Sequence, residues 1–174
     1  MDHSPKSHRV GLYFGSFNPI HLGHLVIANH MLHEADLDEV WFVVTPSSPH
    51  KQGVELIPEQ HRLQMAHLAI ADHPHLKAID VEFALPRPNY TADTMRHLRE
   101  AHPEVVFSII MGQDNLTSFH TWKDHESLVA AHRLLIYPRL NPGAEAPPPS
   151  PTDWLAHPNV EVHQAPLIAI SSTY

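Results

Sequence analysis

The sequence contains no cysteine among its 174 residues. Disulfide bonds and thiolate metal sites are therefore excluded, which favours a cytoplasmic setting. No apolar run approaches the roughly 18 residues that a transmembrane helix needs, and the first residues lack the apolar region of a signal peptide. We therefore expect a cytoplasmic protein that does not bind a membrane.

Positive charge is scarce as well. Lysine and arginine together number 11 against 19 acidic residues, and the net charge is −8 with the histidines neutral. This balance argues against binding DNA or RNA, because their phosphates require a basic surface. One nucleotide is not excluded, since a phosphate pocket needs only a local positive potential. The chain length suits a single domain, which we expect to span residues 1–174.

Histidine, in contrast, is abundant, with 18 residues scattered along the chain. Most of them are expected to be solvated or to cap helices. A histidine-rich metal-binding protein is one interpretation of this count, and stoichiometric binding of Zn²⁺ or Ni²⁺ without nucleotide would favour it. The proline-rich residues 141–151 show no periodicity, which predicts an exposed, flexible loop.

Strand-like and helix-like segments alternate along the chain. Continuous apolar strands separated by helices predict an α/β fold, with a doubly wound, Rossmann-like parallel sheet of five to six strands and helices on both faces. Ligands of such sheets bind beyond the carboxyl ends of the strands. The expected strands are residues 9–14, 40–44, 77–81, 105–111, 133–137 and 160–163, and the expected helices are residues 22–35, 58–71, 91–101 and 124–131.

The most informative motif is GLYFGSFNPIHLGH at residues 11–24. It joins an apolar strand to a helix through a polar turn, and a helix N-terminus at such a turn is a ready anion site. His21 and His24 are three residues apart and are expected on the same side of the first helical turn. Gly23 between them is expected to let a ligand approach the backbone.

Two polar motifs follow the next strands. SSPHK at residues 47–51 carries Lys51, which is either a solvated lysine or a mobile positive charge for a phosphate. RPNYTADT at residues 87–94 precedes a helix, for which Thr91 is a plausible cap. N–H groups left uncapped at that helix could receive a substrate anion.

Two more motifs lie further along the chain. MGQDNLTSFHTWK at residues 111–123 contains Gly112, which permits close approach, and Asp114, which is either a helix cap or an acceptor for ribose hydroxyls. Trp122 is either a packing residue or a flat face for a heteroaromatic ring. The last motif is the run of hydroxyl side chains Ser171, Ser172 and Thr173, which can cap a helix or hold phosphate oxygens.

Taken together and in this order, these motifs resemble the bacterial nicotinate-mononucleotide adenylyltransferase family, within the HxGH nucleotidyltransferase superfamily. The matching stretches GSFNPIHLGHL, SPHK, RPNYTADT, MGQDNLTSFHTWK and ISST span residues 11–173. The HxGH turn alone identifies only the superfamily, whereas the two stretches at residues 87–94 and 111–123 are specific to the family.

The resemblance implies that ATP and nicotinate mononucleotide react to give nicotinate adenine dinucleotide and pyrophosphate, with Mg²⁺, in NAD biosynthesis. It also implies a role for each motif. The catalytic pair that holds the ATP phosphates would be His21 and His24. The residues expected at ATP or phosphate are Gly15, Ser16, Phe17, Asn18, Lys51, Gly112, Asp114, Ser171, Ser172 and Thr173. Those expected at the mononucleotide are Tyr90, Thr91 and Trp122, with Trp122 stacked on the pyridine ring. No metal ligand is expected from the protein.

The sequence departs from the family at one important place. The hydroxyl motif of the family continues to an isoleucine and a phosphate-binding arginine, whereas this sequence stops at Tyr174, so we expect an incomplete C-terminus. Two alternatives remain at this point: another nucleotidyltransferase of the same fold, or a nucleotide-binding module without turnover. The sequence does not decide between nicotinate and nicotinamide mononucleotide, and it does not give the oligomeric state.

Overall fold

The computed structural model describes residues 5–47, 49, 53, 55–138 and 150–166. In these ranges, six strands form one sheet in the order β3-β2-β1-β4-β5-β6, and every neighbouring pair is parallel. The strands are β1 (His8–Gly15), β2 (Glu39–Val44), β3 (Leu76–Ile79), β4 (Val105–Gly112), β5 (Leu134–Tyr137) and β6 (Val160–Val162). The helices are α1 (Leu22–Glu34), α2 (Glu59–Ile70), α3 (Thr91–Ala101), α4 (Gln113–Thr117) and α5 (His125–Ala131), with 3-10 turns η1 (Val81–Ala84), η2 (Phe119–Thr121) and η3 (Trp154–Ala156).

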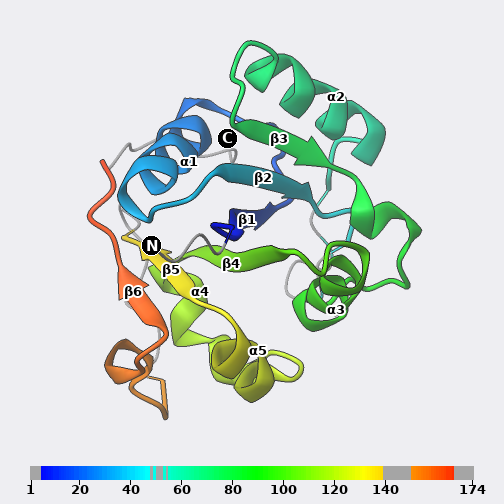
Figure 1. Ribbon diagram of the computed structural model, residues 1–174. Helices are drawn as coiled ribbons and strands as arrows, with labels where there is room; N and C mark the ends of the chain where they lie inside the picture. The colour runs from blue at the N-terminus through cyan, green and yellow to red at the C-terminus, as the bar shows by residue number, and fades with distance from the viewer. Residues whose placement is uncertain (1–4, 48, 50–52, 54, 139–149, 167–174) are drawn as a thin grey trace.

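Alternate side chains of the central strands enter two separate apolar layers. In β2, Val40 and Phe42 pack in the layer that contains α1 and α2, whereas Trp41 and Val43 pack in the layer that contains α3, α4 and α5. Figure 1 shows α1 and α2 above the sheet and α3 and α5 below it. Because both faces are covered, β2 is buried along its whole length, and its sequence is almost continuously apolar.

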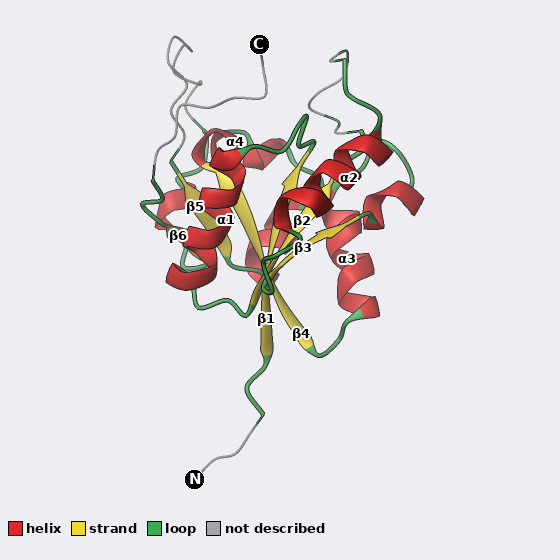
Figure 2. Ribbon diagram, turned by 90° about the horizontal axis from the view of Figure 1, so that it is seen from above, coloured by secondary structure: helices red, strands yellow, loops and turns green. Residues whose placement is uncertain are grey.

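The strand order reverses between β1 and β4, which lie side by side although α1, β2, α2, β3 and α3 separate them in the chain. A doubly wound sheet opens a crevice at this reversal, beyond the carboxyl ends of the two strands. Gly15 ends β1 and Gly112 ends β4, so the predicted nucleotide motifs leave the sheet at the same edge. In Figure 2, α4 marks this edge, opposite the N-terminal end of β1. The predicted doubly wound parallel sheet is confirmed.

The strand predicted for residues 77–81 was wrong at its carboxyl end. It stops at Ile79, and Val81 begins the 3-10 turn η1, in which the Phe83 N–H donates to the carbonyl of Asp80 at 2.9 Å. The polar residues after β4, which the sequence left without a helix, form the short helix α4. The proline-rich residues 141–149 and the C-terminal residues 167–174 lie outside the described part of the chain. None of the helices that the structure describes combines the length and apolarity needed to cross a bilayer.

Candidate active site

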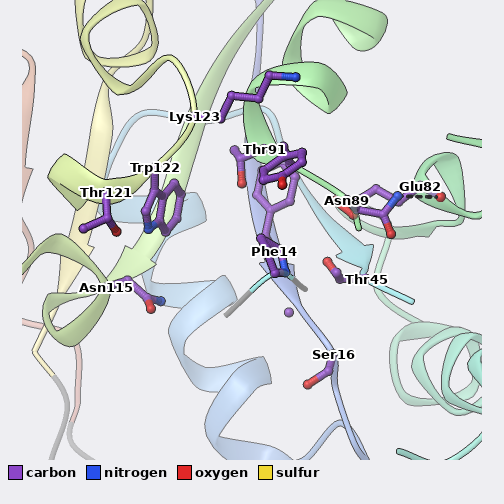
Figure 3. A pocket seen from close by; sticks show the side chains of 13 residues that line it. Phe14, Ser16, Thr45, Glu82, Asn89, Thr91, Asn115, Thr121, Trp122 and Lys123 are labelled. Carbon is purple, nitrogen blue, oxygen red and sulfur yellow. Dashed lines mark hydrogen bonds between the residues drawn. The ribbon is translucent and has the colours of Figure 1, made fainter. Parts of the chain in front are cut away.

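A cavity with a volume of about 150 Å³ lies at the carboxyl edge of the sheet, beside the reversal of strand order. In Figure 3, Trp122, Thr121 and Asn115 stand on one side of Phe14, while Thr45, Asn89 and Glu82 stand on the other. Five residues predicted from the sequence line the cavity: Gly15, Ser16, Tyr90, Thr91 and Trp122. The other lining residues are Phe14, Thr45, Pro49, Glu82, Asn89, Asn115, Thr121 and Lys123.

The turn after β1 depends on a glycine and on a buried ring. A Cβ atom at Gly15 would lie 3.0 Å from the Phe17 ring, so a side chain there would require the ring to move by a few tenths of an ångström. Phe17 has a φ of 45° and only 3% exposure, and its ring packs edge-on against Phe42 at 5.2 Å. The side chain of Phe17 therefore belongs to the core, and only its backbone is available to shape the predicted nucleotide turn.

Asn18 is held against the segment that precedes α2. Its Oδ1 accepts a hydrogen bond from the N–H of Ile57 at 2.8 Å, and its Nδ2 donates to the carbonyl of Glu55 at 3.4 Å. Both ends of the amide are thus bonded to backbone. In this structure Asn18 fixes the position of a loop, and a direct contact with phosphate stays a prediction.

His21 and His24 lie together at the N-terminus of α1, as their spacing predicts. The two rings stack with centroids 3.8 Å apart and an angle of 18°. The His21 N–H donates to Nδ1 of His24 at 3.1 Å, and the His24 ring also packs edge-on against Phe17 at 5.0 Å. Because Nδ1 accepts a hydrogen bond, the neutral His24 ring carries its proton on Nε2 and can donate it to an anion.

Gly23 serves the histidine pair rather than an incoming ligand. A Cβ atom at Gly23 would lie 2.9 Å from Cε1 and 3.0 Å from Nδ1 of His21. The space that the sequence assigned to a ligand is therefore filled by the His21 ring. The glycine of the HxGH motif lets this ring lie across the first turn of α1 and stack on His24.

The N-terminus of α3 faces the cavity without a capping side chain. Tyr90, not Thr91, is the N-cap residue, so the predicted cap was wrong: Thr91 is already the first helical residue. The side chain of Tyr90 accepts no hydrogen bond from the N–H groups of the first turn. Lys123 reaches over the same end, with its Nζ 5.1 Å from the centroid of the Tyr90 ring and 3.0 Å from the carboxylate of Asp93. This end of the cavity thus combines backbone donors with an ammonium group, as an anion requires.

Trp122 combines packing with exposure to the cavity. It is half-buried, and its ring lies 5.4 Å from the Phe119 ring, which is fully buried. Trp122 therefore packs on the core and also lines the cavity, while its role as a flat face for a heteroaromatic ring stays a prediction. At the neighbouring end of β4, a Cβ atom at Gly112 would meet Oδ1 of Asp114 at 2.5 Å. Asp114 lies in the first turn of α4 but does not cap it, because the N-cap residue is Gly112.

Arg62 is a buried cation that sequence reasoning missed. It is 1% exposed, and its guanidinium donates to the carbonyls of Ser16 at 2.6 Å, Thr45 at 2.9 Å and Ile57 at 2.7 Å. Arg62 thus ties the turns after β1 and β2 to the start of α2. The sequence did contain a signal for this burial. Position 62 lies four residues before Ala66, on the same helix face, and is therefore expected to be buried.

Glu82 and Asn89 are two further buried residues of the cavity wall that the sequence did not single out. Glu82 is 2% exposed and Asn89 is 5% exposed. Burial raises the pKa of Glu82 to about 7, although hydrogen bonding by the hydroxyls of Thr45 and Thr94 acts against the shift. A carboxyl just after a strand of the sheet fits the rule that ligand sites lie at carboxyl ends, and this rule could have identified it.

The raised pKa of Glu82 predicts a pH-dependent stability. The folded protein holds this proton up to about pH 7, whereas an unfolded chain releases it near the ordinary value of 4.5. The free energy of unfolding therefore falls as the pH rises from 4.5 to 7. In urea denaturation, Glu82→Gln should gain on the order of 2–3 kcal/mol relative to the native protein between pH 4.5 and pH 8. A difference that stays constant over this range would show that Glu82 titrates normally.

Some of the predicted residues lie outside the described ranges. Lys51, Ser171, Ser172 and Thr173 fall in this group, so their roles stay predictions. Among the residues that the structure describes, no group of three or more His, Cys, Asp or Glu side chains could hold a metal ion.

The reversed strand order, the stacked histidines at the first β–α turn and the cavity at the carboxyl edge of the sheet define a protein of the nucleotidyltransferase class. The family described as cytidylyltransferase-like matches residues 12–174, and the chain belongs to this family.

Within this class, the relatives specify a narrower group. A relative from Flavobacterium psychrophilum, named "Probable nicotinate-nucleotide adenylyltransferase", is 46% identical over 166 residues, which cover 95% of this chain and 83% of the relative. A relative of the same name from Bacteroides fragilis is 43% identical over 166 residues, which cover 95% of this chain and 79% of the relative. The chain belongs to the nicotinate-nucleotide adenylyltransferase family.

A solved structure supports the fold independently. The nicotinic acid mononucleotide adenylyltransferase of Plasmodium falciparum, in complex with NaAD, matches with a TM-score of 0.75 over 95% of this chain and 80% of the other. Its sequence identity is 21%, so the likeness concerns the fold.

Proposed function

We propose that this chain transfers the adenylyl group of ATP to nicotinate mononucleotide, which yields nicotinate adenine dinucleotide and pyrophosphate in NAD biosynthesis. The observation that carries the proposal is the cavity at the strand reversal, which joins the β1 turn to Trp122. It occurs in a chain that is 46% identical to relatives named for this activity.

The chemistry needs no nucleophilic side chain. A phosphate oxygen of the mononucleotide attacks the α-phosphorus of ATP, a new P–O bond forms, and the bond between the α-phosphorus and the bridging oxygen breaks. Pyrophosphate carries away the electron pair. The nucleophile is already an anion, so the protein contributes positioning and charge stabilisation. His21 and His24 donate hydrogen bonds to the ATP phosphates, where negative charge grows.

Mg²⁺ enters as part of the substrate, bound to the ATP phosphates and to water. This ion is commonly held by substrate phosphates rather than by an all-protein cage. ATP and nicotinate mononucleotide are the proposed partners, and the cytoplasmic location stays a prediction.

A substrate panel tests the proposal. The protein is mixed with Mg²⁺ and ATP or CTP, together with nicotinate mononucleotide, nicotinamide mononucleotide or phosphopantetheine, and pyrophosphate release is measured. We expect the highest kcat/KM for ATP with nicotinate mononucleotide. Preference for another pair would favour a different nucleotidyltransferase, and binding without pyrophosphate release would favour a nucleotide-binding module.

Trp122→Ala should raise KM for nicotinate mononucleotide about 5-fold, because stacking on an aromatic ring contributes about 1 kcal/mol beyond burial. Trp122→Phe keeps an aromatic face and should recover most of the loss. KM for ATP, measured in the same assays, should change less than 3-fold. An unchanged KM for the mononucleotide in Trp122→Ala would remove Trp122 from the substrate site.

A further inference from the structure

One wall of the cavity carries two buried oxygen atoms that have no hydrogen-bond partner within the described part of the chain. They are Oε2 of Glu82 and Oδ1 of Asn89. Both residues line the cavity. A buried polar atom without a partner costs free energy, and such atoms in a native protein call for an explanation.

The orientation of Asn89 is set by its own amide nitrogen. Nδ2 donates to the carbonyl of Glu82 at 3.0 Å and to the carbonyl of Pro86 at 3.3 Å. With the nitrogen held by backbone acceptors, the other end of the amide is the acceptor Oδ1. Figure 3 shows Asn89 next to Glu82, on the side of Phe14 away from Trp122. The terminal torsion of a glutamate is soft, so the carboxyl of Glu82 can turn either oxygen toward the cavity.

Two acceptor oxygens in one wall call for hydrogen-bond donors on the ligand. At neutral pH, nicotinate mononucleotide has an ionised carboxylate, a ring nitrogen without a proton and a largely ionised phosphate. Its remaining donors are the 2′- and 3′-hydroxyl groups of the ribose. Because the ribose joins the pyridine to the phosphate, a mononucleotide stacked on Trp122 with its phosphate at the β1 turn would place the ribose in the cavity that Glu82 and Asn89 also line.

We propose that Glu82 and Asn89 form the subsite that accepts hydrogen bonds from the ribose hydroxyls of the mononucleotide. This inference rests on the proposed function.

The test couples changes in the protein to changes in the substrate. The value of kcat/KM is measured for nicotinate mononucleotide and for its 2′-deoxy and 3′-deoxy analogues. The enzymes are the native protein, Glu82→Met, which cannot accept a hydrogen bond, and Glu82→Gln, which keeps the shape of the side chain. Glu100→Gln, an exposed carboxyl on α3, is the control.

The native protein should lose 10-fold or more in kcat/KM with at least one deoxy analogue, since a site built for a hydroxyl rejects a substrate that lacks it. In Glu82→Met the kcat/KM values of the natural and deoxy substrates should differ less than 3-fold. Glu100→Gln should behave as the native protein. If Glu82→Met lowers kcat/KM by the same factor for the natural and the deoxy substrates, the carboxyl only shapes the wall and the proposal is overturned.

The outcomes separate this inference from the proposed function. If the native protein makes no dinucleotide from the natural mononucleotide, the proposed function fails. The same series is then measured by calorimetric binding of the three mononucleotides. Coupling between Glu82 and one hydroxyl in binding would still support the subsite, and equal losses would overturn it. Should Glu82→Met prove unfolded by circular dichroism, Glu82→Leu, which also lacks an acceptor, decides with the same comparison.

Discussion

His24→Ala is expected to lower kcat by about 10²–10³-fold, the usual cost of removing one donor that stabilises charge in a transition state. Nδ1 of His24 accepts from the His21 N–H, so the proton of the neutral ring lies on Nε2, the atom that we propose donates to the ATP phosphates. His21→Ala should have an effect of the same size, since the two rings stack at 3.8 Å.

The fold should survive both substitutions, because each ring is only part of a packed aromatic group. Steady-state measurement of pyrophosphate release at saturating substrate gives kcat, and circular dichroism with thermal unfolding checks the structure. His33→Ala is the matched control, since it lies on the exposed face of the same helix. It should retain native turnover. Unchanged turnover in both His21→Ala and His24→Ala would rule out the assigned role.

Arg62→Met should lower the free energy of unfolding by about 3–5 kcal/mol, because it removes the donor of three buried carbonyls at once. The methionine fills much of the space but leaves the carbonyls of Ser16, Thr45 and Ile57 without their donor. Unsatisfied buried groups of this kind cost about 1–3 kcal/mol each. Urea denaturation measures the loss.

Two controls separate the hydrogen bonds of Arg62 from its charge and its position. Arg62→Lys keeps the positive charge but replaces the planar guanidinium by a single ammonium group, which cannot reach all three carbonyls. It should therefore recover only part of the lost free energy of unfolding. Gln64→Met, on the exposed face of the same helix, should stay within about 0.5 kcal/mol of the native protein. A loss below about 1 kcal/mol in Arg62→Met would contradict the account of Arg62 as the tie between the turns.

The sheet could be predicted because its strands are buried on both faces. β2 and β4 are nearly continuous apolar runs, and their positions were predicted within one residue. Both ends of α3, Thr91 and Ala101, were predicted correctly. The weak strand before η1 was extended too far, because β-branched residues such as Val81 also occur in single turns packed on a sheet.

The candidate site was predictable where a polar motif follows a strand. The β1 turn, the N-terminus of α3 and Trp122 indeed line one cavity. Buried polar residues were harder to find, since Arg62 and Glu82 act through contacts that depend on segments distant in the sequence. Gly23 was misread for a related reason, because only the folded turn shows that the His21 ring fills the space above it.

The central claim is that the stacked histidines hold the phosphates while Trp122 holds the pyridine. A crystal structure with bound nicotinate adenine dinucleotide tests it most directly. We expect the pyridine ring stacked on Trp122 and the pyrophosphate bridge within hydrogen-bond distance of His21 or His24. A dinucleotide bound with its phosphates away from both histidines, or with no ring on Trp122, would contradict the account.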